Sequence, residues 1–241
     1  PGIGEWTKQK FDNRIIPPFT PLEARKTDNG LTVSMWGRTY EWKNSLFPAA
    51  IISQKEPMLD GPVALEADGK PLSGAKVRVD KIELYRAELT AAYDSPVCSV
   101  VNHAWVEYDG ISYFNVTVKA KEPLKNLRIR IPMPGDLARY LHTSSESISW
   151  GSKLTEKLKD GKRSFHYFPV VWIGSEDKGL CFFTETRNGW KNRSQEVNTI
   201  VKNKREVVYE VSLADALKPG ETFSFEFGLL ASPVRPLPKK Y

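Results

Sequence analysis

The sequence has few of the residues on which metal sites and disulfide frameworks depend. Its 241 residues include two cysteines, Cys98 and Cys181, and three histidines, with no Cys-x-x-Cys or His-x-x-x-His spacing. We therefore expect no metal site and no cofactor. Both cysteines lie in apolar stretches. A chain this long can bury a core without a covalent staple, so we expect free buried thiols, with a disulfide between them as the alternative.

Long apolar runs and dense charge blocks are also absent. No stretch of about 18 apolar residues occurs, so the sequence predicts no membrane span. Lys and Arg outnumber Asp and Glu by 35 to 29, but the resulting charge of +6 is spread along the chain. Nucleic-acid binding is therefore not expected, because it usually requires a basic patch on a recognisable module. The patterns of Ser-His-Asp hydrolases, P-loops and dinucleotide-binding glycines are missing as well.

What the sequence does contain is a series of short strand patterns. Runs rich in Val, Ile, Thr and Tyr recur about every ten residues and are separated by Gly, Pro and Asp turns, such as the turn at residues 108–110. Between Leu127 and Ile131, apolar residues alternate strictly with arginine. The pattern predicts an all-β fold: a large two-sheet antiparallel β-sandwich with a short helix and long loops. The helix is expected at residues 135–142, before a polar loop at 144–162.

The domain organisation follows from composition. Residues 1–30 are rich in proline and charge and predict an extended N-terminal arm. Residues 31–230 form the predicted sandwich. Residues 231–241 contain three prolines. We expect them to be a stiff linker toward a C-terminal domain that is missing from this chain.

The segment from Phe168 to Trp190 indicates a candidate site. Apolar runs at 170–173 and 180–183 flank a polar connection at 174–179, which predicts a β-hairpin. A carboxylate, a guanidinium and an indole follow the second run, and tryptophan rings with polar neighbours suit sugar recognition. The candidate residues for a glycan or interdomain contact are Trp172, Glu176, Asp177, Glu185, Arg187 and Trp190.

Catalytic interpretations of these residues are weaker. Glu185 and Asp177 could form the carboxylate pair of a glycosidase, but charged residues at hairpin ends are usually solvated. His166 could act as a general base, although a single strand histidine is more often structural. We predict no catalytic residue. Among the tryptophans, Trp36 and Trp105 are interpreted as core residues from their strand positions.

Several segments, in the same order along the chain, resemble the N-terminal β-sandwich domain of large bacterial proteins related to glycoside hydrolase family 123. They are residues 34–40, 108–110, 130–132 with 140–142, the hairpin 172–185 with 189–190, and the closing stretch 227–236.

The resemblance implies a multidomain carbohydrate-active protein in the periplasm or outside the cell. Enzymes of that family remove N-acetylgalactosamine with substrate assistance, and their Asp-Glu pair lies in a barrel domain that follows, so no catalytic residue transfers to this chain. It implies a non-catalytic module that supports a C-terminal (β/α) barrel domain of the same protein and contacts glycan. The alternatives are a free-standing carbohydrate-binding module and a sandwich-fold carbohydrate lyase or epimerase.

Overall fold

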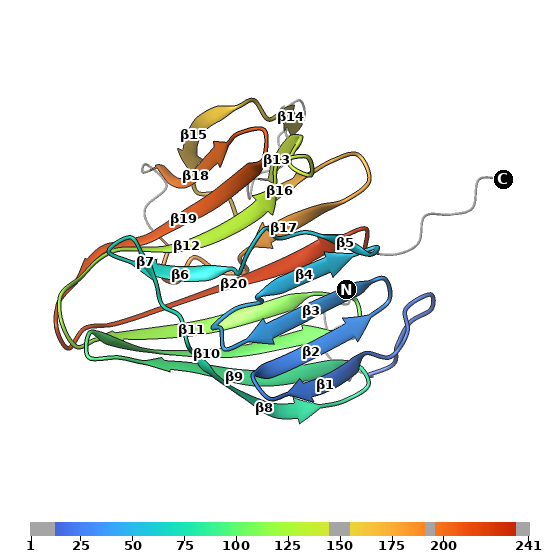
Figure 1. Cartoon of the computed structure of the whole chain (residues 1–241), viewed down its shortest axis with the longest axis horizontal. Coiled ribbons are helices and arrows are strands. Elements are labelled where there is room, and N and C mark those ends of the chain that lie inside the picture. The colour runs from blue at the N-terminus through green and yellow to red at the C-terminus, as the bar shows by residue number, and fades with distance from the viewer. Residues whose placement is uncertain (1–12, 145–154, 191–195, 235–241) are drawn as a thin grey trace, which may run out of the picture.

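A computed structural model describes residues 13–144, 155–190 and 196–234. Within these ranges the chain contains strands and connecting turns and no helix, and the strands form three antiparallel sheets (Figure 1). The prediction of an all-β antiparallel sandwich is confirmed. The expected number of sheets is corrected from two to three.

The first sheet has five strands that pair in chain order. They are β1 (Glu23–Thr27), β2 (Gly30–Met35), β3 (Arg38–Lys43), β4 (Ala50–Ser53) and β5 (Glu56–Pro57). The strand β1 lies within the stretch predicted to be an extended arm. Its backbone pairs with β2 from Glu23↔Ser34 to Thr27↔Gly30, so residues 23–27 are part of the five-stranded sheet.

The second sheet has nine strands. In spatial order they are β14 (Thr155–Lys157), β13 (Tyr140–Ser144), β16 (Val170–Gly174), β17 (Gly179–Phe183), β20 (Thr222–Ser232), β11 (Ser112–Ala120), β10 (Cys98–Glu107), β9 (Arg86–Asp94) and β8 (Lys76–Ile82). The third sheet has six strands in the order β15 (Gly161–His166), β18 (Glu196–Lys202), β19 (Glu206–Leu217), β12 (Leu124–Pro134), β6 (Ala64–Ala67) and β7 (Lys70–Pro71).

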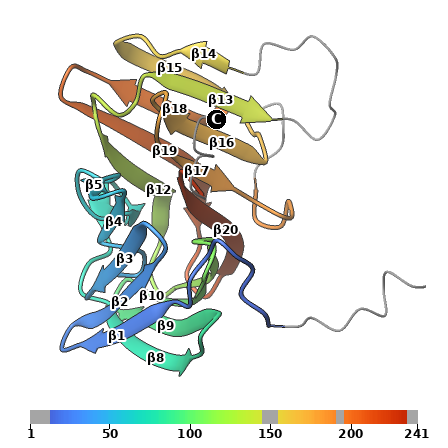
Figure 2. The same cartoon turned by 90° about the vertical axis from the view of Figure 1, so that its right-hand side faces the viewer.

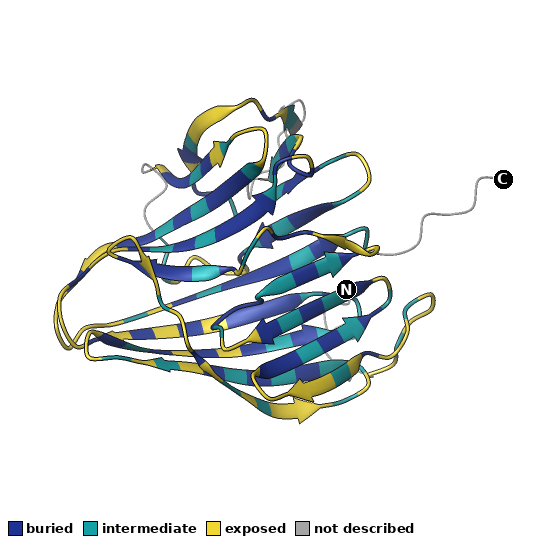
Figure 3. Cartoon of the chain, viewed as in Figure 1, coloured by how far each residue is buried: buried dark blue, intermediate teal, exposed yellow. Residues whose placement is uncertain are grey.

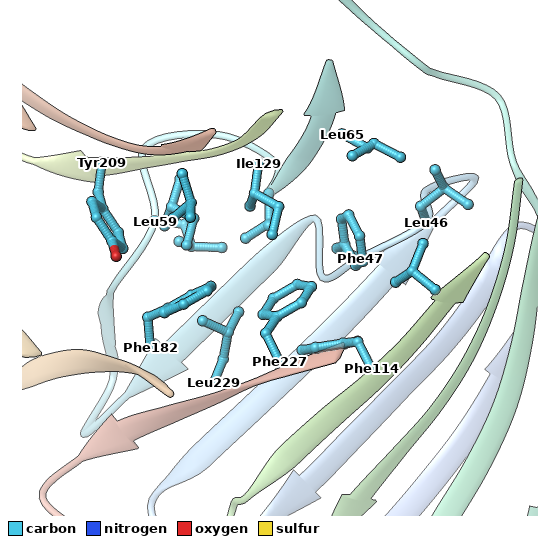
Figure 4. Packing of buried hydrophobic residues seen from close by; sticks show 14 of the residues in the cluster. Leu46, Phe47, Leu59, Leu65, Phe114, Ile129, Phe182, Tyr209, Phe227 and Leu229 are labelled. Carbon is cyan, nitrogen blue, oxygen red and sulfur yellow. The ribbon is translucent and has the colours of Figure 1, made fainter. Parts of the chain in front are cut away.

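The nine-stranded sheet forms one layer, and the two smaller sheets lie side by side over it as the other layer (Figures 1 and 2). The core fills the space between the layers (Figure 4). Phe182 and Phe227 extend from the large sheet toward Tyr209 of the six-stranded sheet and toward Phe47, which follows β3. Phe227 lies 5.2 Å from Phe47 and Phe182 lies 5.6 Å from Tyr209, measured between ring centroids.

Burial alternates along the strands, as the two-residue repeat of a β-strand requires (Figure 3). In β10, Val100, Asn102 and Ala104 are buried, whereas Val101 and His103 are exposed. The nine-stranded sheet therefore has an inner face on the core and an outer face away from it. The prediction of two core tryptophans is wrong: Trp105 shares the outer phase of β10 and is half-buried, and Trp36 lies half-buried in the turn between β2 and β3.

The helix predicted at residues 135–142 is wrong. Residues 135–137 form a turn, and Tyr140 begins strand β13, which pairs with β16. The amide of Arg139 donates to the carbonyl oxygen of Gly174 at 2.9 Å, so its hydrogen bond goes to a neighbouring strand instead of a helical turn. Leu141 is buried between half-buried neighbours, which is the periodicity of a strand.

The hairpin predicted within 168–190 is confirmed as β16 and β17, which pair from Val170↔Phe183 to Gly174↔Gly179. The prediction of free thiols is also confirmed: Cys98 is buried, and Cys181 is half-buried on the outer face. Burial raises the pKa of the Cys98 thiol and raises that of Cys181 to about 11. Both thiols therefore remain protonated at neutral pH and are poor nucleophiles.

Replacement of Phe227 tests the shared core. Its ring is fully buried and lies against those of Phe47, Phe114 and Phe182. We expect Phe227→Ala to lower the free energy of unfolding by about 3–5 kcal/mol, measured by urea denaturation, because a large cavity opens where both layers meet. Thr222→Ala, at the exposed start of the same strand, should change it by less than about 0.5 kcal/mol. Equal losses for the two variants would contradict this account.

Candidate functional site

The β16–β17 hairpin separates the six predicted site residues into two groups. Trp172, Glu176 and Asp177 lie toward the hairpin turn, whereas Glu185, Arg187 and Trp190 follow the other end of β17. The ends of β17 are four residues apart, or roughly 13 Å along an extended strand. The structure thus does not bring all six together, and the two groups are separate parts of the surface.

Trp172 lies on the outer face of the nine-stranded sheet and is half-buried. Its indole crosses Gly174 and Gly179: a Cβ atom at either glycine would fall 2.4 Å or 2.5 Å from the ring. Its Nε1 donates to the hydroxyl of Ser232 at 3.2 Å. Because the two glycines have no side chain, the ring packs directly on their backbone, beside the end of β20.

Polar side chains border this ring at the hairpin turn. The carboxylate of Glu176 accepts hydrogen bonds from the Tyr140 hydroxyl at 2.8 Å and from Nη1 of Arg139 at 3.3 Å. A bond from its own backbone amide, together with these two partners, lowers the pKa of Glu176. Asp177 is exposed next to it, and Lys178 forms an ion pair with Glu56 of β5. This end of the hairpin therefore combines an aromatic ring with charged and hydroxyl groups.

The second group is arranged differently. Glu185 and Arg187 are exposed, but Trp190 packs against the core with its ring near those of Tyr167, Phe182 and Phe225. Core packing is enough to account for the position of this indole. His166, the alternative general base, is exposed at the end of β15 in the six-stranded sheet, whereas Glu185 follows β17 in the large sheet.

The sequence prediction missed a polar cluster that holds the end of β20, which we call the Arg38 clamp: Arg38, Tyr40 and Ser53 around residues 231–234. Arg38 is 2% exposed. Its guanidinium donates to the carbonyl oxygens of Val234 at 2.9 Å, Ala231 at 3.3 Å and Trp36 at 3.3 Å. The available signal was the alternation of β3, which places Arg38 in phase with the buried Tyr40 and Trp42.

The rest of the clamp consists of hydroxyl groups from the five-stranded sheet. The Tyr40 hydroxyl donates to the carbonyl oxygen of Gly110 at 2.9 Å and accepts from the amide of Ala231 at 3.2 Å. Ser53 donates to the carbonyl oxygen of Ser232 at 3.0 Å. Gly110 has φ 84°, and a Cβ atom there would lie 2.3 Å from Nη1 of Arg38, so glycine is required on both counts.

Two hollows open elsewhere. One of about 310 Å³ lies where the five- and six-stranded sheets meet, and Lys43, Leu46 and Arg130 are among its lining residues. The other, of about 460 Å³, lies on the six-stranded sheet, with Arg128 and Glu210 in its lining. In the second hollow, Arg128 pairs with Glu210 at 3.4 Å, and it also pairs with Glu66 outside the lining at 2.8 Å. Neither lining includes any of the six predicted residues.

Among the described residues, no three His, Cys, Asp or Glu side chains are grouped so that they could hold a metal ion. The same part of the chain contains no helix long and apolar enough to cross a membrane.

Replacing Arg38 tests the clamp. We expect Arg38→Met to lower the free energy of unfolding by about 2–3 kcal/mol, because the carbonyl oxygens of Ala231 and Val234 lose a charged donor. Hydrogen exchange of the amides at the end of β20 should also become faster. Arg25→Met, at an exposed position of β1, serves as the matched control and should alter neither quantity. Unchanged exchange at the end of β20 in Arg38→Met would show that the clamp does not hold it.

The pH dependence of stability tests the burial of Tyr40. Burial raises the pKa of Tyr40 from 10.0 to about 12. Below pH 10 the phenol is protonated in both the folded and the unfolded chain. Above pH 10 the unfolded chain loses this proton first, so the free energy of unfolding falls as the pH rises through about 12. Comparing pH 9 with pH 11 by urea denaturation, wild type should lose about 1.4 kcal/mol more than Tyr40→Phe. Parallel curves for the two proteins would contradict the burial of this phenol.

Comparison with known proteins gave a family match and several structural matches. The family model "Glycoside hydrolase 123, third domain" matches residues 27–233. Comparison with curated proteins gave no match. Galactose 1-epimerase from Lactobacillus acidophilus NCFM is 8% identical with a TM-score of 0.53, over 89% of this chain and 98% of that one.

Two further structural matches have lower scores. The GalM/aldose epimerase homologue from C. elegans is 10% identical with a TM-score of 0.49, over 88% of this chain and 99% of that one. Heparan sulfate lyase HepC from Pedobacter heparinus is 9% identical with a TM-score of 0.47, over 88% of this chain and 35% of that one. At these identities a structural likeness shows the fold alone.

The family match covers most of the chain and confirms the resemblance to glycoside hydrolase family 123. The description gives the position of the domain as third, whereas the sequence resemblance indicated an N-terminal domain. A third domain implies that other domains exist in the same protein. The chain belongs to the glycoside hydrolase 123 third-domain family.

Proposed function

We propose that this domain is a non-catalytic module of a multidomain glycoside-hydrolase-like protein. It supports a catalytic (β/α) barrel domain that follows it, and it contacts glycan beside that junction. The observation that carries the proposal is the Arg38 clamp, which holds residues 231–234 with side chains from a different sheet. The family match supports it further, because a third domain belongs to a larger protein.

The clamp is suited to hold a neighbouring domain in a fixed orientation. A flexible tether needs no buried polar contacts, whereas here three side chains bond to the backbone of residues 231, 232 and 234. Burying a guanidinium costs free energy unless its donors are satisfied. The donors of Arg38 are satisfied by three carbonyl oxygens, two of which belong to residues 231 and 234, so the guanidinium fixes the direction in which the chain leaves β20. A domain attached there would take its orientation from the sandwich.

Glycan contact is assigned to the hairpin turn. Trp172 presents a ring beside the Tyr140–Glu176 pair, a combination suited to the apolar face and the hydroxyl groups of a sugar. Because Trp172 bonds to Ser232, a bound glycan would lie next to the chain that leads to the following domain. The family 123 resemblance also supports a periplasmic or extracellular location as part of this proposal.

The full-length protein provides the test of support. We expect Arg38→Met to increase the maximum dimension of the protein in small-angle X-ray scattering, because the following domain gains freedom, while Arg25→Met leaves it unchanged. Superimposable scattering curves for all three proteins would overturn the supporting role. The chain of residues 1–241 should not hydrolyse p-nitrophenyl N-acetyl-β-galactosaminide, and turnover at enzymatic rates would overturn the non-catalytic assignment.

Calorimetric titration of the same chain with N-acetylgalactosamine-containing oligosaccharides tests glycan contact. Trp172→Ala should weaken binding at least tenfold, because a stacking surface is lost. Trp36→Ala removes an indole of similar exposure from the β2–β3 turn and should leave the affinity unchanged. Equal affinities for Trp172→Ala and wild type would remove Trp172 from the site.

A further inference from the structure

A second surface feature lies on the outer face of the nine-stranded sheet. Val101, His103, Asn115, Thr117 and Ser224 are all exposed, and together we call them the uncharged patch. The strand register places His103 opposite Asn115, Val101 opposite Thr117, and Thr117 opposite Ser224. The five side chains therefore form a continuous surface over β10, β11 and β20.

None of the five patch residues is charged, whereas 27% of the residues of the chain are. Outward positions of other strands carry arginine or lysine, such as Lys76 and Arg78 in β8 and Arg128 in β12. Covering a charged side chain with a ligand costs its solvation, whereas neutral hydroxyl and amide groups can exchange water for ligand hydroxyls at little cost. The patch is therefore suited to an uncharged polar ligand.

His103 is held in one orientation by a hydrogen-bonded chain across three strands. Thr90 Oγ1 donates its proton to Asp80 at 2.5 Å, so its contact with Nδ1 of His103 at 3.0 Å must use a proton of the imidazole. Arg78 bonds to the other oxygen of Asp80 at 2.7 Å. In the neutral ring, Nε2 is then left as a hydrogen-bond acceptor.

The charge on Asp80 maintains this arrangement. Burial alone would raise the pKa of Asp80, but hydrogen bonds from Thr90 and Arg78 and the charge of Arg78 outweigh burial and lower it. The carboxylate therefore stays ionised near neutral pH and keeps accepting from Thr90. As a result, His103 has a fixed tautomer before any ligand arrives, which reduces the entropy lost on binding.

Glu226 and Trp105 border the patch, and both are held by neighbouring side chains. Glu226, opposite Asn115, is half-buried and accepts a hydrogen bond from Thr186. Trp105 lies two residues beyond His103 in β10, with the Arg86 guanidinium 4.5 Å from its ring centroid and the Tyr113 ring 5.5 Å away. The faces of this indole pack against the Arg86 guanidinium and the Tyr113 ring, so the indole bounds the patch without offering a face to a ligand.

We propose that the uncharged patch is a second carbohydrate-binding site, which binds the hydroxyl groups of a neutral sugar residue through His103 and Asn115. This inference rests on the glycan contact in the proposed function and extends it to a second location. Trp172 lies on β16, three strands from β11, which is roughly 14 Å at ordinary strand spacing. The sites are therefore separate, and both lie on the same face of one sheet.

The test is an NMR titration of the 241-residue chain with methyl β-galactoside and methyl N-acetyl-β-galactosaminide, observing the histidine ring protons and backbone amides. We expect shifts at His103 and Asn115, and a Kd at least tenfold weaker in His103→Ala/Asn115→Ala. His166→Ala, an exposed histidine of another sheet, is the matched control and should not change the Kd. Because both patch residues are exposed, amide spectra of the double variant should keep the wild-type dispersion.

The outcomes separate this inference from the proposed function. Shifts confined to the surroundings of Trp172, with normal affinity in the double variant, overturn the second site and leave the proposed function intact. Shifts at the patch that persist in Trp172→Ala support the second site on its own. No response to either sugar overturns the second site and the glycan contact, while the supporting role is measured independently by scattering. Protection of the patch by the following domain in the full-length protein, without sugar, would also overturn it.

Discussion

The structure depends on covering the inner face of one very wide sheet. Nine strands present an apolar surface too large for either smaller sheet, and the core continues without a break beneath both. Phe227 of β20 contacts Phe47, next to the five-stranded sheet, and lies beside Phe182, which contacts Tyr209 of the six-stranded sheet. Because apolar burial supplies most of the favourable free energy of folding, the two covering sheets depend on one shared core over the neighbouring strands β17 and β20.

This arrangement explains why the clamp exists where it does. The five-stranded sheet covers the large sheet with β3 and β4 over the end of β20. There the side chains of Arg38 and Ser53 reach the backbone of β20. Burial lowers the pKa of Arg38, against the influence of Tyr40 and Asp109, but a guanidinium remains charged in proteins. The cation is held by carbonyl oxygens rather than by an ion pair with a described carboxylate. Such a group fixes the geometry of the backbone that accepts its hydrogen bonds.

The sequence predicted those features that depend on neighbours along the chain. The β16–β17 hairpin and the alternating strand around Ile129 were found because turn residues and two-residue periodicity are local signals. The strand β12 extends through Pro132 to Pro134, although proline cannot donate to a neighbouring strand. The carbonyl oxygen of Pro132 accepts a hydrogen bond from the amide of Asp60, and the nitrogen of Pro132 faces the same side of β12. On that side the pairing between β12 and β6 ends at Arg130. The missing amide proton therefore leaves no gap in the pairing.

Features that depend on distant partners were not predictable in this way. A periodicity of two assigns Trp105 to one side of β10 but does not say which side meets the core, and the wrong side was chosen. Residues 135–142 could alternate as a strand or cap as a helix until pairing with β16 decided the matter. The six candidate residues were close in sequence, yet an extended hairpin carries its two ends apart. The role of Arg38 was not predictable, because the carbonyl oxygen of Ala231 that it binds lies 193 residues later in the sequence.

Charged side chains are distributed differently on the two outward faces of the sandwich, and this distribution affects where a ligand can bind. On the six-stranded sheet, Arg128 pairs with Glu66 and Glu210, and the lining of the larger hollow also includes the charged residues Lys162 and Glu196, so a ligand there would cover several charged groups. On the nine-stranded sheet, charge is kept at the border: Arg86 pairs with Glu107, and Asp80 with Arg78. The centre of that face carries neutral donors and acceptors. Thr117 and Ser224 bond to each other at 3.0 Å, whereas the side chains of His103 and Asn115 are exposed and can exchange water for a ligand. Since water is the partner most readily exchanged for a sugar hydroxyl, the large sheet is the face on which glycan recognition costs least.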